Sequence, residues 1–342
     1  MRLQEFEGWP AGLLDCAAHE LWAHLDGPAI VHLPGARAPA LFVSVLLHGN
    51  ETGGWEALRL LQRRFEGGVL PRSMIVLIGN VEAARFRLRR LDHQPDYNRI
   101  WCGGGRGGQQ GVEGPEADLA REIVARIGAH ELFCSVDVHN NTGVNPHYAC
   151  VTAEDATSLA LAARFARPVI LVHQPATVLA RAFAPFAPAI ILEAGRPGEQ
   201  RGVEHVAAYL EGLLRLETLP GAPATAVDLY RTVASVKLRE DVRFGFAGVE
   251  GPREGLDLHL LAEFEHFNFE ELDADTLFAH VPEGAALPFT VTDDDGRDVA
   301  DDWFRRRGDE VRFARRVVPA MFSPDVRILR QDVVCYLMER LS

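Results

Sequence analysis

Between residue 28 and about residue 216, short apolar runs alternate with segments of helical periodicity. Leu41–Leu47 has the length and β-branched content of a buried strand, and Glu51–Phe65 follows it with Leu58 and Leu61 on one helical face. Further strands are expected at Met74–Gly79, Leu132–Val138, Tyr148–Thr152, Pro168–Val172 and Ala189–Leu192, further helices at Glu116–Ile127, Glu154–Phe165 and Gln200–Leu216, and a glycine-dense loop at Gly103–Gly114. This order predicts an α/β fold with a mostly parallel or mixed central sheet flanked by helices.

The pattern changes after residue 217. Leu219–Ala224 combines proline, glycine and alanine, which is typical of a linker. Beyond it, turn-rich acidic segments separate β-leaning runs at Leu229–Leu238, Leu256–Phe264, Phe289–Thr292 and Val311–Val318. We therefore expect two domains, an α/β domain at residues 1–217 and a smaller β-rich domain at residues 218–342.

The net charge of the chain bears on which kinds of molecule it is expected to bind. The 342 residues include 35 Lys+Arg and 48 Asp+Glu, so the formal net charge is −13. A protein whose main task is to bind nucleic acid needs a basic face, and this balance argues against such a partner. It does not exclude a local arginine cluster that holds an anion.

Neither a membrane segment nor a secretion signal is expected. The longest apolar runs, such as Ala182–Leu192, are shorter than the ~20 residues that a helix needs to cross a bilayer. The N-terminal region lacks the basic-then-apolar pattern of a signal peptide. The five cysteines, Cys102 among them, are widely spaced without a C-x-x-C pair, which is typical of free thiols in a reducing cytoplasm. We therefore expect a cytoplasmic protein.

Two histidines and a glutamate follow expected strands. His48 and Glu51 stand in a turn directly after Leu41–Leu47, and His139 follows Asp137 at the end of another strand. The carboxyl ends of strands in an open α/β sheet face the crevice where ligands bind, so the three side chains can meet at one ion. Two histidines and one glutamate are a ligand set of catalytic zinc hydrolases. The alternative is an ordinary helix start in which Glu51 favours the positive end of the helix dipole.

Glu193 closes the apolar strand Ala189–Leu192. A buried carboxylate is costly to ionise unless it is paired or lies near a cation. A helix cap or a salt bridge is the ordinary explanation. Beside a zinc site, Glu193 becomes a candidate general base that takes a proton from water and returns it to the leaving amine.

A fourth candidate element is the sequence DYNR, which ends in Asn98 and Arg99. An amide next to a guanidinium suits a substrate carboxylate, which arginine can bind through two hydrogen bonds. The preceding arginines, Arg85, Arg87 and Arg89, have the alternative explanation of an exposed basic helix face.

These elements resemble, in order and approximate spacing, the motifs of the succinylglutamate desuccinylase/aspartoacylase family of the zinc carboxypeptidase clan. The resemblance covers about residues 38–216 and rests on His48-Gly49-Asn50-Glu51, Asn98-Arg99, Asp137-x-His139 and Glu193-x-Gly195. It implies a zinc-carboxypeptidase-like fold. It also implies a zinc-dependent hydrolase that cleaves the amide bond of a small anionic N-acyl amino acid or a related amide.

The resemblance assigns roles to individual residues. It implies that one zinc ion per chain is bound by His48, Glu51 and His139, with Glu193 as the catalytic base. It implies further that substrate is bound by Asn98, Arg99 and Arg181.

Two positions depart from the family pattern. The arginine that polarises the scissile carbonyl in this family stands seven residues before the Asn-Arg pair, where this chain has Leu91. Arg90 is the nearest candidate, with Arg89 and Arg85 as alternatives. The segment after the second histidine also differs, and Asn140 there is a candidate either for binding a polar substrate or for an ordinary turn.

Two other functions remain open from the sequence. The chain could be a zinc carboxypeptidase that acts on short peptides, or a metal-binding module without catalysis. The presence of Glu193 beside a complete ligand set argues against the inactive module. The sequence is compatible with an oligomer and leaves the acyl group and the amino acid undefined.

Overall fold

The computed structural model describes residues 2–101, 113–247 and 255–341. Its contacts divide the chain into two compact units. Unit 1 comprises Met1–Asn141 and His147–Val227, and unit 2 comprises Thr142–Pro146 and Asp228–Ser342. The domain ranges 1–217 and 218–342 stay a prediction. Cys102 and most of the expected loop Gly103–Gly114 lie outside the described residues.

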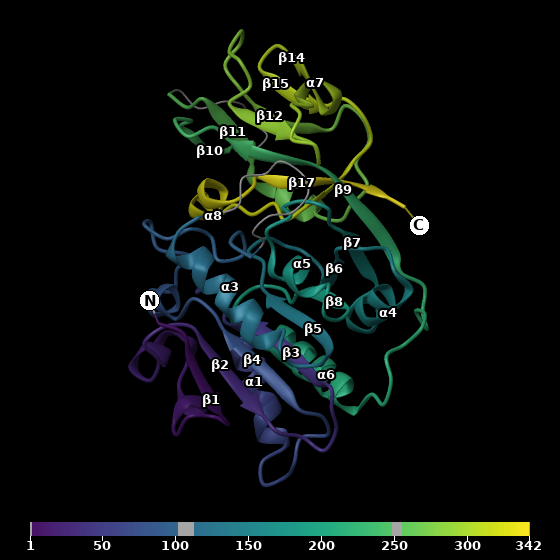
Figure 1. Cartoon of the computed structure of the whole chain (residues 1–342). Helices are drawn as coiled ribbons and strands as arrows, with labels where there is room; N and C mark the ends of the chain where they lie inside the picture. Colours follow the sequence, from purple (N-terminus) through teal and green to yellow (C-terminus); the bar gives the residue numbers. More distant parts are fainter. Residues whose placement is uncertain (1, 102–112, 248–254, 342) are drawn as a thin grey trace. The chain divides into compact units, whose positions relative to one another are not determined.

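A mixed β-sheet forms the centre of unit 1 (Figure 1), with the strand order β1-β2-β4-β3-β5-β8-β6-β7. The four adjacent strands β4, β3, β5 and β8 are parallel to one another. β2 pairs with β4, and β6 pairs with β8, in antiparallel orientation. The strands are β1 Gln4–Glu7, β2 Ala29–Leu33, β3 Ala40–Val45, β4 Met74–Ile78, β5 Leu132–His139, β6 Tyr148–Val151, β7 Pro168–Leu171 and β8 Ala189–Glu193.

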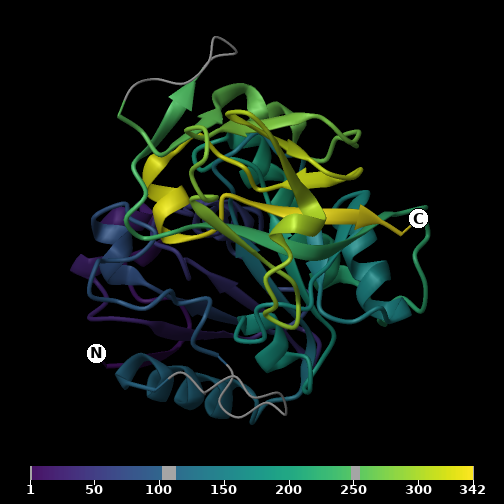
Figure 2. The same ribbon diagram turned by 90° about the horizontal axis from the view of Figure 1, so that it is seen from above.

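Helices cover both faces of this sheet. They are α1 Gly53–Arg64, α2 Val81–Arg85, α3 Pro115–Ile127, α4 Ala156–Phe165, α5 Leu179–Phe183 and α6 Gln200–Arg215, with 3₁₀ turns η1 Leu13–Asp15 and η2 Ala18–Ala23. On one face, Ile123 of α3 and Phe183 of α5 belong to an apolar cluster with Phe42 of β3. On the other face, α1 packs on β3 and β5 and also contacts α6. The turned view of Figure 2 shows α3 lying along the outside of unit 1. The predicted α/β fold is confirmed.

The central strands place the candidate site. Every residue of β3, β4, β5 and β8 is buried, as expected for parallel strands that are covered on both faces. β3, β5 and β8 are neighbours and run in the same direction, so their carboxyl ends lie at one edge. His139 and Glu193 are paired across β5 and β8 at that edge.

Unit 2 contains two groups of strands around a phenylalanine-rich core. The first group has the order β13-β9-β17-β16, and the second has the order β10-β11-β12-β15-β14. The core includes Phe264, Phe278 and Phe313. The elements are β9 Asp228–Leu238, β10 Phe244–Ala247, β11 Leu258–Leu261, η3 Ala262–Phe267, β12 Leu277–His280, β13 Phe289–Thr292, α7 Ala300–Trp303, β14 Phe304–Arg307, β15 Glu310–Phe313, β16 Val318–Ala320, α8 Val326–Gln331 and β17 Cys335–Arg340.

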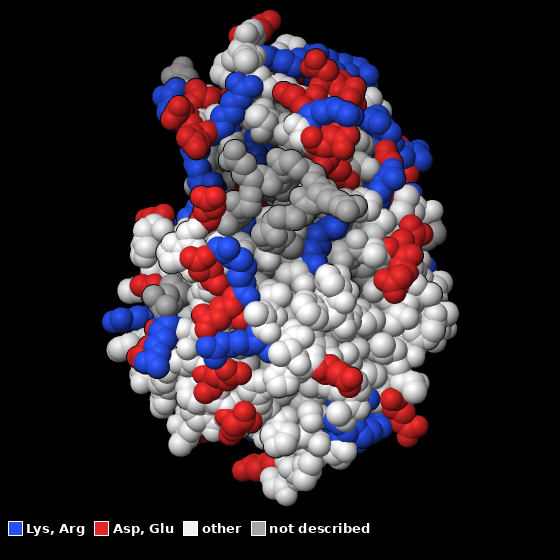
Figure 3. Space-filling view, in the orientation of Figure 1, with Lys and Arg blue, Asp and Glu red and all other residues white. Residues whose placement is uncertain are grey.

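The surface carries charges of both signs. Figure 3 shows acidic and basic side chains interspersed on one face of the molecule. Within the described ranges, no helix combines the length and the apolar character that a membrane span requires. The described cysteines, Cys16, Cys134, Cys150 and Cys335, are free thiols.

Candidate metal centre and active site

The structure brings His48, Glu51 and His139 together in the interior of unit 1. Each is at most 5% exposed, and one potential ligand atom from each lies within 4.8 Å of the other two. His48 and Glu51 belong to the turn between β3 and α1, and His139 is the last residue of β5. Gly49 allows this turn to pass close to α2, because a Cβ there would lie 2.2 Å from the backbone nitrogen of Ala84.

Both imidazoles direct the same nitrogen at the Glu51 carboxylate. His48 Nδ1 lies 2.7 Å from Glu51 Oε1, and His139 Nδ1 lies 2.7 Å from Glu51 Oε2. The two ring centroids are 5.0 Å apart. The three side chains therefore converge on one small volume, as a shared ion requires.

Carboxylates also hold the other nitrogen of each imidazole. His48 Nε2 lies 2.9 Å from Asp96 Oδ1, and His139 Nε2 lies 2.9 Å from Asp137 Oδ2. An ionised carboxylate can only accept, so each Nε2 carries a proton and donates it. This arrangement leaves Nδ1 of both rings as the metal-binding nitrogen and orients the rings, as the outer partners of metal-binding histidines do.

The protonation of the cluster is also consistent with a cation site. Burial and Arg89 lower the pKa of His48, but Glu51 and Asp96 outweigh them and raise it above 6.5. For His139, burial is likewise outweighed by Asp137 and Glu51, which raise the pKa well above 6.5. Each imidazole is thus held between two carboxylates. Two imidazole nitrogens and one carboxylate converge on the same small volume, so the donor set fits a divalent cation.

Glu193 lies at the end of β8, beside this cluster. It is 8% exposed, and within the described residues its Oε2 is buried without a hydrogen-bond partner. Burial raises the pKa of Glu193 to about 7, although the nearby His139 lowers it. The described part of the chain shows neither a salt bridge nor a helix-capping bond of this side chain, so the ordinary explanations of a buried carboxylate do not account for it.

Arg89 reaches the cluster, whereas Arg90 contacts its own loop. Arg89 is 6% exposed and donates to Asp96 Oδ2 through Nε at 3.2 Å and Nη2 at 2.9 Å. Its Nη1 lies 3.4 Å from Glu51 Oε1. Arg90 Nη1 instead donates to the carbonyl oxygen of Gln94 at 2.8 Å.

The alternative of an exposed helix face is wrong for Arg89, because α2 ends at Arg85 and Arg89 is buried. The signal that could have identified Arg89 is Asp96. A carboxylate that holds a buried imidazole needs a compensating cation close to it.

Asn98 is adjacent to the cluster, whereas Arg99 and Arg181 donate to backbone carbonyl oxygens. Asn98 Nδ2 lies 3.2 Å from His139 Nε2, and its Oδ1 accepts from the backbone nitrogen of Leu179 at 3.0 Å. Arg99 Nη1 donates to the Asn98 carbonyl oxygen at 2.9 Å. Arg181, in α5, donates through Nη2 to the carbonyl oxygen of His173 at 2.8 Å. Their roles in substrate binding stay predictions.

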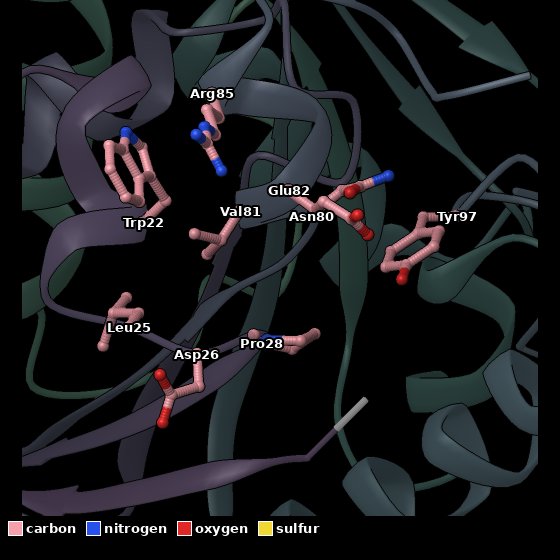
Figure 4. Close-up of a pocket in the computed structure, with 10 residues that line it drawn as sticks. Trp22, Leu25, Asp26, Pro28, Asn80, Val81, Glu82, Arg85 and Tyr97 are labelled. Carbon is pink, nitrogen blue, oxygen red and sulfur yellow. The ribbon is translucent and has the colours of Figure 1, made fainter.

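A separate hollow of about 220 Å³ lies elsewhere in unit 1 (Figure 4). Trp22 and Arg85 line it, and the guanidinium of Arg85 lies 4.0 Å from the centroid of the Trp22 ring. Tyr97 forms part of another wall. The three candidate metal ligands are not among the residues that line this hollow.

The fold and the buried cluster define an α/β protein with a metal-binding arrangement at the carboxyl edge of its central sheet. The family model described as the succinylglutamate desuccinylase/aspartoacylase catalytic domain matches residues 37–217, more than half of the chain. The protein belongs to the succinylglutamate desuccinylase/aspartoacylase family, as the sequence motifs predicted. Residues 37–217 include His48, Glu51, His139 and Glu193.

Curated relatives match a shorter segment. The succinylglutamate desuccinylase of Burkholderia orbicola (strain MC0-3) is 38% identical over 88 residues, which are 24% of this chain. The matched segment spans about a quarter (25%) of that relative's length. A second succinylglutamate desuccinylase, from Burkholderia lata, is 36% identical over 78 residues, 22% of each chain.

Solved structures match most of the chain. Succinylglutamate desuccinylase from Vibrio parahaemolyticus aligns with a TM-score of 0.59 at 14% identity, covering 92% of this chain and 86% of its own. The succinylglutamate desuccinylase/aspartoacylase from Rhodobacter sphaeroides gives 0.56 at 18% identity, with coverages of 91% and 89%. Murine aminoacylase 3 gives 0.53 at 18% identity, with coverages of 90% and 97%. These similarities show a shared fold.

Proposed function

We propose that the protein is a zinc-dependent deacylase that hydrolyses the amide bond of a small N-acyl amino acid. The observation that carries this proposal is the convergence of His48, Glu51 and His139, with the second nitrogen of each imidazole held by a carboxylate. Membership of the family supports the reaction class. The names of the relatives, succinylglutamate desuccinylase and aminoacylase 3, support an N-acyl amino acid as the substrate.

Zinc is the cation that we propose for this site, one ion per chain. Two imidazoles and one carboxylate are typical ligands of catalytic zinc and leave a coordination position open. When bound, zinc supplies Lewis-acid activation of the amide carbonyl and of a water molecule. Asp96 and Asp137 would keep the Nδ1 atoms of the two imidazoles directed at the ion.

Glu193 is the proposed general base. Its Oε2 has no competing hydrogen bond among the described residues, and a pKa near 7 suits a group that both accepts and donates a proton at neutral pH. In the proposed reaction, Glu193 takes a proton from the attacking water. It then returns this proton to the leaving nitrogen, so that the protein ends in its starting state.

We propose that arginines bind the negatively charged groups of the substrate and stabilise the charge that forms during the reaction. Arg89 is better placed than Arg90 to act near the cluster, since its guanidinium is 3.4 Å from Glu51. We therefore propose Arg89 as the group that stabilises the oxyanion formed at the scissile carbonyl. Arg99 and Arg181, with Asn98, remain the proposed substrate-binding residues.

Because the described cysteines are free thiols, we also propose a cytoplasmic location.

The test is a substrate screen with zinc-loaded protein. We expect hydrolysis of N-acetyl- or N-succinyl-amino acids and little turnover of dipeptides, measured as release of the free amino acid. In the variant Glu193→Gln, zinc content should stay unchanged while kcat falls by about 10²–10⁴-fold, the contribution typical of general acid–base catalysis.

Three outcomes would contradict this proposal in different ways. Faster cleavage of dipeptides would identify a carboxypeptidase instead. Full turnover by Glu193→Gln would remove Glu193 from the mechanism. A purified chain that binds no zinc after chelation and back-titration would contradict the metal site itself.

A further inference from the structure

Asn140 occupies a central position between the loops that carry the candidate site. It directly follows His139, the last residue of β5, and it is 4% exposed. In the sheet, β5 lies between β3, which leads to Glu51, and β8, which ends in Glu193. Any group at this position can therefore contact the loops on both sides.

The backbone and side chain of Asn140 bind three different partners. Its backbone nitrogen donates to Glu51 Oε2 at 3.2 Å. Its Oδ1 accepts from the backbone nitrogen of Gly53 at 2.8 Å, and its Nδ2 donates to the carbonyl oxygen of Gly195 at 3.0 Å. Both ends of the amide are thus engaged with main-chain groups of the flanking loops.

The contact with Gly53 also replaces a helix cap. The first amides of a helix lack partners within the helix and need an acceptor from elsewhere. Thr52, the N-cap residue of α1, makes no side-chain capping bond. Asn140 supplies an acceptor from the neighbouring strand instead.

Gly53 leaves the space that the side-chain amide of Asn140 occupies. A Cβ at this position would lie 2.6 Å from Asn140 Oδ1 and 2.7 Å from Nδ2. No side chain larger than hydrogen fits at residue 53 while Asn140 keeps this conformation.

We propose that Asn140 is a positioning residue, which fixes Glu51 and Glu193 relative to His139 and does not bind the substrate. This inference rests on the proposed metal-dependent function. An amide is suited to the task because it combines one acceptor and one donor in a fixed plane, which a carboxylate or a hydroxyl does not offer. From the sequence alone, Asn140 is a candidate either for binding a polar substrate or for an ordinary turn.

The test compares Asn140→Ala with the wild-type protein in two metal-based measurements and one kinetic measurement. We expect a 10–100-fold weaker zinc affinity in competition with a chromophoric chelator, as is typical when an outer partner of a metal ligand is lost. We also expect a changed visible absorption spectrum of the cobalt(II)-substituted protein. Steady-state kinetics should show a lower kcat with little change in KM.

Gly53→Ala tests the same contact from the other side. The added methyl group should displace the amide and weaken zinc binding in the same direction, even if Asn140→Ala folds poorly. Asn80→Ala is the matched control, because Asn80 is also a buried asparagine whose Oδ1 caps a helix, α2. The control should lower the Tm while zinc affinity and the cobalt spectrum stay as in the wild type.

The outcomes separate the inference from the proposed function. A raised KM with unchanged zinc affinity in Asn140→Ala would identify a substrate ligand and overturn the inference. A lower Tm alone, as in the control, would also overturn it by showing only a structural role. Failure of the wild-type chain to bind zinc would instead contradict the proposed function on which the inference rests.

Discussion

The burial of Glu193 suits its proposed role as a general base, but it lowers the stability of the folded protein at neutral pH. Burial raises its pKa to about 7 from an ordinary value of 4.5. The folded protein therefore binds this proton more tightly than the unfolded chain does, and stability is lost as the pH rises from about 4.5 to about 7. At about 1.4 kcal/mol per pH unit, the cost above pH 7 is on the order of 3 kcal/mol in the metal-free protein.

Glu193→Gln removes this ionisation. We expect the variant to be more stable than the wild type at pH 8, by up to about 3 kcal/mol, in the absence of metal. At pH 4.5 the two proteins should have nearly equal free energies of unfolding, since the wild-type carboxyl is then protonated in the folded state. Urea denaturation at both pH values measures the difference. A pH-independent difference would show that Glu193 is not the buried ionisable group described here.

The residues of the site could be predicted to different degrees. His48, Glu51, His139 and Glu193 were recognisable as possible neighbours because each lies at the end of an apolar strand or in the turn after it, and the strand ends of a parallel sheet meet at one edge. Arg89 and Asn140 were harder to interpret. Their environment is set by hydrogen bonds between loops that are distant in the sequence, and such partners leave no local pattern.

At the scale of elements, Gly54 marks a close approach of α1 to the sheet. A Cβ there would lie 2.8 Å from Val45 Cγ1 and 3.0 Å from Val138 Cγ1. Valine has few alternative rotamers, so these methyl groups cannot easily turn away. Although alanine favours a helix by about 1 kcal/mol over glycine, we expect Gly54→Ala to lower the free energy of unfolding by about 1–3 kcal/mol through overpacking.

Gly212 of α6 provides the matched control in urea denaturation. A Cβ there would have open space, with no heavy atom within 4 Å apart from its chain neighbours and the backbone of its own helix. Gly212→Ala should therefore raise the free energy of unfolding, by up to about 1 kcal/mol, because only helix propensity changes. The same sign of effect in both variants would contradict the packing argument for Gly54.

The elements of unit 1 were more predictable than those of unit 2. The central strands of unit 1 are buried on both faces and appear as continuous apolar runs. The run Val311–Val318 of unit 2 instead covers most of β15 and only the first residue of β16, and the exposed Arg315 and Arg316 lie between the two strands. The four-residue strands β6, β7 and β13 were predicted, whereas β1 was missed because its sequence, QEFE, contains only one apolar side chain.

At the scale of the whole molecule, net charge and site charge are separate properties. The chain carries a formal net charge of −13, and acidic and basic side chains are interspersed on the face in Figure 3. The proposed anionic substrate would meet the buried cluster, where Arg89 and a bound cation would offset the charges of Glu51, Asp96 and Asp137. Composition alone predicts that nucleic acid is not a partner, but it could not describe this site.

Zinc binding should stabilise unit 1 specifically. A ligand that binds only the folded state adds RT ln(1 + [L]/Kd), which is about 2.7 kcal/mol at a free concentration 100-fold above Kd. The candidate ligands all belong to unit 1. If the two units unfold in separate transitions, only that of unit 1 should shift, by several degrees, when zinc is added to the chelated protein in a calorimetric scan. Glu51→Gln, which removes the charged ligand, should lose the shift. An equal zinc-dependent shift in this variant would mean that the ion binds elsewhere.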